Sequence, residues 1–128
     1  MKRLLTLLIL IFGFWAVALQ IKAALLLDVS INEIAWTGSK NSSNDEWLEL
    51  YNNTDKNILL DGWVLKSQDG KLNIKLKGEI FAHDFYLMER TDDNSVLNVK
   101  ADLIYSGSLP NNGTDLKLFD NFSPRHPI

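Results

Sequence analysis

The chain of 128 residues contains no cysteine. This absence excludes disulfide bonds, thiolate metal sites and the lipid-modified cysteine that anchors bacterial lipoproteins. A small domain without cross-links depends on buried apolar surface for its stability. We therefore expect a single hydrophobic core that holds the fold alone.

Signatures of catalysis are missing as well. His83 and Asp84 stand in a segment typical of a tight turn, His126 lies near the C-terminus, and no Gly-x-Ser-x-Gly nucleophile motif is present. Glu46 and Glu49 are an odd number of positions apart, so in a strand they point to opposite faces and cannot flank one glycosidic bond. We expect no catalytic residue and no enzymatic activity.

A metal or cofactor site is not indicated either. Asp92, Asp93 and Asn94 offer oxygen ligands in TDDNS, but their spacing matches no EF-hand loop. A turn stabilised by its own Asp and Asn side chains is the simpler interpretation. We therefore expect no cofactor.

Helical periodicity is absent after residue 27. Short apolar segments alternate with polar turns such as SQDGK and LPNNGTD. This pattern leaves no room for crossover helices and predicts an all-β antiparallel sandwich in residues 28–120. We expect about seven strands, at residues 29–36, 46–51, 58–66, 71–77, 85–89, 103–105 and 115–119.

The strand expected at 58–66 has an irregular pattern. Ile58 and Leu60 share one face, whereas Trp63 and Leu65 have the opposite parity. A bulge or bend at Asp61-Gly62 would turn all four inward, since glycine accepts the backbone angles that this requires. The predicted core then comprises Ile31, Leu48, Leu50, Leu60, Trp63, Leu65, Leu72, Ile74, Leu76, Leu116 and Leu118.

Aromatic side chains in NDEWLELYNNT offer the best candidates for ligand contact. Trp47 and Tyr51 share a strand face at about 13 Å, with Glu49 between them. Packing across neighbouring strands is the favoured interpretation, because aromatic side chains in strands pack more often than they bind ligands. A sugar-binding platform that uses Trp47, Tyr51 or Trp36 is the alternative.

A short row of lysines lies on the segment KLNIKLKG. Lys71, Lys75 and Lys77 alternate with apolar residues, which places them on an outer strand face. Exposed lysines discourage strands from pairing edge to edge, so a solvated face explains the row without a ligand.

The N-terminus combines a basic start with an apolar run. Lys2 and Arg3 precede the uncharged run Leu4–Leu19, which is followed by Gln20 and Lys22. We interpret residues 1–23 as a hydrophobic signal or anchor helix, with cleavage after residue 18 or 23 favoured over retention. Basic residues next to an apolar segment stay on the cytoplasmic side of the membrane. Both interpretations therefore predict an exported domain that is secreted, periplasmic or at the cell surface.

Cleavage after residue 23 would make the domain more acidic. It removes three of the 13 basic residues and none of the 16 acidic ones, so the formal charge falls from −3 to −6. A net negative charge disfavours a nucleic-acid partner that is bound through its phosphates. We expect a protein or a cell-envelope component as the partner.

The order of motifs resembles the lamin tail domain, particularly the type found in exported bacterial proteins. The resemblance covers residues 31–120 and rests on INEI at 31–34, EWLELYN at 46–52, LDGW at 60–63 and the asparagine-glycine turn before the last apolar strand. It implies an immunoglobulin-like sandwich without catalytic residues. Similar domains are binding or surface-attachment modules, and a membrane-anchored fragment of a larger surface protein or a carbohydrate-binding domain is the alternative.

The C-terminus departs from the pattern of similar domains, which usually continue into a further strand. Here NFSPRHPI follows, and Pro124 and Pro127 each remove a backbone donor. We interpret residues 121–128 as a short tail or a truncated last strand. The resemblance then implies an incomplete sheet edge, with Phe119 or Phe122 exposed and open to strand addition or self-association.

Overall fold

The computed structural model describes residues 27–122. Nine strands and no helix form this part of the chain. The strands are β1 (Val29–Ala35), β2 (Trp47–Asn52), β3 (Ile58–Leu59), β4 (Val64–Ser67), β5 (Asn73–Lys75), β6 (Glu79–Ile80), β7 (Phe85–Arg90), β8 (Leu103–Tyr105) and β9 (Leu116–Phe119).

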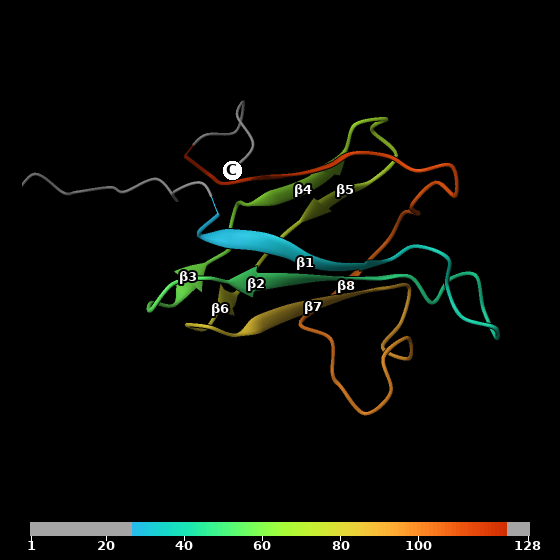
Figure 1. The fold of residues 1–128 in the computed structure, drawn as a ribbon, viewed down its shortest axis with the longest axis horizontal. Coiled ribbons are helices and arrows are strands. Elements are labelled where there is room, and N and C mark those ends of the chain that lie inside the picture. Colours follow the sequence, from blue (N-terminus) through green and yellow to red (C-terminus); the bar gives the residue numbers. More distant parts are fainter. Residues whose placement is uncertain (1–26, 123–128) are drawn as a thin grey trace, which may run out of the picture.

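The strands form three sheets (Figure 1). The largest has the order β1-β2-β7-β8, the second the order β5-β4-β9, and β3 pairs with β6 in a short ribbon. In Figure 1 β4 and β5 lie to one side of β1, β2 and β7, and β3 and β6 lie at the left end. Buried side chains of the two larger sheets belong to one hydrophobic cluster, so the inner faces of these sheets share a core. This all-β architecture is consistent with an immunoglobulin-like sandwich.

Alternation of side chains places one face of β2 and one face of β4 in the core. Leu48 and Leu50 of β2 are fully buried, as is Leu65 of β4. Ile31 and Leu116 are only partly buried and pack against the cluster. The remaining residues of the predicted core are at most 3% exposed, namely Leu60, Trp63, Leu72, Ile74, Leu76 and Leu118.

The single strand expected at 58–66 is wrong. The segment forms two strands in different sheets, β3 and β4, separated by a turn at Asp61-Gly62. The expected change of parity is present, because Leu60 and Trp63 are both buried on either side of this turn. Gly62 has φ +84°, a left-handed conformation that glycine adopts without strain. A turn rather than a bulge therefore redirects the chain from one sheet to another.

The expectation of an antiparallel sandwich fails at one pair of strands. β7 and β8 are parallel, and residues 91–102 connect them without a helix. Parallel neighbours need a crossover of about a dozen residues or more, and this loop supplies it. The split at Asp61-Gly62 and the short strand β6 raise the count from the seven strands expected to nine.

Two expectations concern the ends of the chain. The signal or anchor helix at 1–23 lies outside the described residues, as do residues 123–128 of the tail. Strand β9 is an edge of its sheet in the described part of the chain. Phe119 is half-buried and Phe122 is exposed. Within residues 27–122 no helix is long and apolar enough to cross a membrane.

Candidate functional site

The segment EWLELYN supplies an inner strand of the large sheet. β2 lies between β1 and β7, so both of its edges are hydrogen-bonded. Leu48, Leu50 and Asn52 point into the core, and each is 0% exposed. An amide among leucines needs hydrogen bonds, because a buried polar group without partners is costly.

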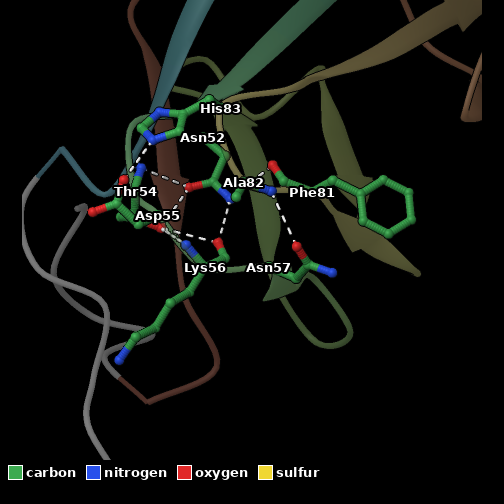
Figure 2. Close-up of polar contacts among 8 residues, drawn as sticks. All are labelled: Asn52, Thr54, Asp55, Lys56, Asn57, Phe81, Ala82 and His83. Carbon is green, nitrogen blue, oxygen red and sulfur yellow. Dashed lines mark hydrogen bonds and ion pairs between the residues drawn. The ribbon is translucent and has the colours of Figure 1, made fainter.

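Asn52 meets this need by holding two loops together (Figure 2). Its Nδ2 donates to the carbonyl oxygens of Lys56, Ile80 and Phe81 at 2.7, 3.2 and 2.9 Å. Its Oδ1 accepts from the backbone nitrogen of Thr54 at 3.0 Å and from the Thr54 hydroxyl at 2.8 Å. The last residue of the motif is therefore a structural clamp at the end of β2.

The turn at 81–84 packs against the same loop (Figure 2). The Ala82 amide donates to Asn57 Oδ1 at 3.1 Å, and His83 Nε2 lies 2.7 Å from Asp55 Oδ1. Asp84, which follows His83 in the sequence, accepts a hydrogen bond from the Phe85 amide through its Oδ1. These side chains shape a surface turn, and their contacts give no triad geometry.

Glu46 lies buried at the other end of β2. It is 3% exposed, and its Oε1 lies 3.1 Å from Arg90 Nη1. Its Oε2 accepts from the Leu109 amide at 3.0 Å. A buried charge pair is tolerated when extra hydrogen bonds satisfy its atoms, as here. Glu46 thus ties the loop before β9 to the large sheet.

Glu89 performs a similar role on the outer face of β7. It is 0% exposed because the crossover loop covers it, and it accepts from the amides of Ser95 and Val96 at 2.7 and 3.1 Å. Strand alternation alone places Glu89 on a solvent face, so the sequence carried no signal for its burial. Glu46 and Glu89 are loop anchors that the sequence did not reveal.

The oxygen-rich segment TDDNS also serves the crossover loop. Asn94 Nδ2 donates to Asp92 Oδ1 at 2.9 Å, and Asp93 Oδ1 accepts from the Ala101 amide at 2.7 Å. Among residues 27–122 no group of three or more His, Cys, Asp or Glu side chains could hold a metal ion. The arrangement supports the interpretation of the segment as a turn.

Tyr105 is a buried titratable group near Glu46. Burial raises the pKa of Tyr105, and the neighbouring carboxylate of Glu46 raises it further. Its hydroxyl has no hydrogen-bond partner among the described residues. The phenol therefore stays protonated at neutral pH and is a poor base or nucleophile.

The outer face of the large sheet carries the predicted aromatic residues. Trp47, Glu49 and Tyr51 alternate with the buried leucines of β2 and are half-buried. The Tyr51 ring packs on its cross-strand partner Phe85, with the ring centroids 4.9 Å apart and the planes at 45°. Trp36 follows β1 and is 48% exposed.

Two carboxylates lie opposite each other on this outer face. Glu33 of β1 and Glu49 of β2 are direct cross-strand partners. Asn32 Nδ2 donates to Glu49 Oε1 at 2.7 Å. We call this surface the acidic face and define it by Glu33, Trp47, Glu49, Tyr51 and Phe85.

The outer face of the β5-β4-β9 sheet carries lysines. Lys66 of β4 is the direct partner of Lys117 on β9, and Lys75 of β5 lies opposite Val64. The Lys66 ammonium lies 5.5 Å from the centre of the Phe119 ring. We call this surface the lysine face and define it by Val64, Lys66, Lys75, Lys117 and Phe119.

The lysine face differs from the row expected at Lys71, Lys75 and Lys77. Only Lys75 of these three lies on a strand of the sheet. Lys66 and Lys117 join it from neighbouring strands that are distant in sequence. An alternating pattern reveals which face a lysine takes, but it does not reveal which strands are neighbours.

An all-β domain with two larger sheets around one core is consistent with the class of immunoglobulin-like domains. The family model of the Lamin Tail Domain matches residues 23–121. The chain therefore belongs to the lamin tail domain family. A search of curated proteins found no match.

Proposed function

We propose that the protein is an exported, non-enzymatic binding or surface-attachment module. The observation that carries this proposal is that buried and surface polar side chains have different roles. The buried Glu46, Asn52 and Glu89 all hold loops in place. Exposed and half-buried charged and aromatic side chains lie instead on the outer faces of two sheets. Such a rigid scaffold suits recognition of a protein or a cell-envelope component.

Export is supported by the N-terminal sequence. Lys2 and Arg3 favour retention of the N-terminus on the cytoplasmic side of the membrane. The residues after the apolar run are then translocated. A secreted, periplasmic or cell-surface location in a bacterial cell is the setting that we propose.

A reporter fusion tests export. The full chain with a C-terminal phosphatase, which is active only outside the cytoplasm, should show activity in intact bacterial cells. Exchanging Lys2 and Arg3 for glutamate should reduce this activity, because the basic residues set the orientation. Full-length protein that is soluble in the cytoplasm would refute the proposal.

Mass spectrometry of the exported product separates a secreted module from an anchored one. Cleavage predicts a mature N-terminus at Leu19 or Ala24. An intact chain in the membrane fraction would support the alternative of a membrane-anchored fragment of a larger surface protein. Either product agrees with export, so this result decides only the mode of attachment.

Carbohydrate binding is a second candidate because Trp36 is exposed and Trp47 is half-buried. Stacking of a sugar on either indole would quench tryptophan fluorescence during titration with cell-wall sugars. Replacing Trp36 and Trp47 by phenylalanine, singly, would identify the ring that responds. A module that binds only protein predicts no quenching by sugars.

A nucleic-acid partner is not part of this proposal. The chain has a formal charge of −3, and the charge is −6 if residues 1–23 are removed. The net negative charge of the domain opposes the binding of a partner through its phosphates.

A further inference from the structure

The two outer sheet faces carry opposite charge. Strands β1 and β2 contain no lysine or arginine, and their outer face presents Glu33 and Glu49. Strands β4, β5 and β9 contain no aspartate or glutamate, and their outer face presents Lys66, Lys75 and Lys117. The inner faces of both sheets share one core, so the acidic face and the lysine face point away from each other.

Each face also contains a direct pair of like charges. Glu33 lies opposite Glu49 across β1 and β2, and Lys66 lies opposite Lys117 across β4 and β9. Like charges in directly opposed positions destabilise a sheet. The amide of Asn32 and the ring of Phe119 offset this repulsion only in part, because each contacts one member of a pair.

Apolar groups accompany the charges on both faces. Phe85 is 49% exposed beside the half-buried Tyr51, and the half-buried Trp47 lies at the other end of β2 on the same acidic face. Val64 and Phe119 are half-buried on the lysine face. Interfaces combine aromatic and apolar contact area with complementary charge, and both elements are present here.

We propose that the lysine face of one copy of this chain docks on the acidic face of a second copy. Charge complementarity favours a second copy of the chain as the partner. The pair Lys66/Lys117 of one copy and the pair Glu33/Glu49 of the other neutralise each other on contact. Trp47, Tyr51 and Phe85 then contact the apolar groups between the lysines. The contact uses sheet faces and is independent of strand addition at an edge and of export.

This contact joins two different surfaces, so it is heterologous. Each copy keeps one free acidic face and one free lysine face after pairing with a neighbour. A heterologous contact generates a ring if the rotation closes and an open chain if it does not. The association is expected to weaken as salt rises, because exposed charges are screened within about 8 Å at physiological ionic strength.

Charge reversal on one face tests the proposal. The protein is expressed from the full chain and purified in the form that the cell produces. Sedimentation velocity at low salt should show concentration-dependent association of the wild type. We expect two double variants to associate at least about tenfold more weakly than the wild type, since close charge pairs contribute strongly to affinity. These are Lys66→Glu/Lys117→Glu and Glu33→Lys/Glu49→Lys. The loop variant Lys40→Glu/Lys100→Glu makes the net charge more negative by the same amount as Lys66→Glu/Lys117→Glu does, and it should associate as the wild type does.

Mixing the two reversed variants is the decisive step. Each variant keeps one wild-type face, and these faces are complementary, so the mixture should regain the association that each variant lacks alone. A wild type that is monomeric at low salt would overturn the proposal. Association that survives both reversals and high salt would also overturn it, and would indicate pairing at a sheet edge. Failure of the mixture to associate would exclude the face-to-face contact.

Discussion

Replacing Trp63 by alanine is expected to lower the free energy of unfolding by about 3–5 kcal/mol, as large aromatic truncations in a core do. The side chain is 2% exposed and belongs to the shared cluster of the two larger sheets. Its backbone also closes the turn, since the Trp63 amide donates to Leu60 and the Trp63 carbonyl accepts from Leu76. Only the packing is lost in the variant, because these backbone bonds remain.

Urea denaturation at pH 7 measures how much Trp63→Ala lowers the free energy of unfolding. Trp36→Ala serves as the matched control, because Trp36 is 48% exposed and its truncation should change stability by less than about 1 kcal/mol. A loss below about 1 kcal/mol for Trp63→Ala would place the indole outside the core. The inward turn at Asp61-Gly62 would then be wrong.

Exchange of Asn52 for aspartate is expected to destabilise the domain by at least about 3 kcal/mol at pH 7. The carboxylate cannot donate to the carbonyl oxygens of Lys56, Ile80 and Phe81 that Asn52 now satisfies. It would also place a negative charge in a site that is 0% exposed. Both effects act in the folded state, so unfolding should become faster as well as more favourable.

The pH dependence of Asn52→Asp distinguishes the buried charge from a simple packing defect. Burial raises the pKa of a carboxyl group, so the folded variant binds its proton more tightly than the unfolded one. The deficit relative to the wild type should therefore shrink as pH falls toward about 4, the usual pKa of aspartate. A deficit that is constant with pH would contradict the account.

Asn57→Asp is the matched control for this exchange. Asn57 uses Oδ1 to accept from the Ala82 amide at an exposed site. Aspartate keeps that acceptor, so the stability should change by less than about 1 kcal/mol. Equal losses at positions 52 and 57 would show that the clamp at the end of β2 is not specific to the buried amide.

Local patterns in the sequence were sufficient for most of the strands and much of the core. Period-two alternation in EWLELYN places Leu48 and Leu50 inside, and the structure buries both fully. The opposite parity of Leu60 and Trp63 required a redirection of the chain, which the turn at Asp61-Gly62 provides. These features depend on residues that are close in sequence, so a single sequence contains the information.

Features that depend on distant pairing could not be predicted. The parallel pair of β7 and β8 follows from the path of the crossover loop, and the turn expected at TDDNS does not reveal that path. Burial of Glu89 follows from the same loop, because the amides of Ser95 and Val96 reach it from outside the sheet. The like-charge pair Lys66/Lys117 required knowledge that β4 and β9 are neighbours.

Photo-cross-linking in the native host tests most directly whether the outer sheet faces are the binding surfaces of this module. A photoreactive side chain would replace Glu49 on the acidic face, Lys66 on the lysine face or, as a control, the exposed loop residue Asn94. The account predicts specific products from positions 49 and 66, with a second copy of the chain or an envelope component, and none from position 94. Products that arise only from position 94, or equally from all three positions, would contradict it.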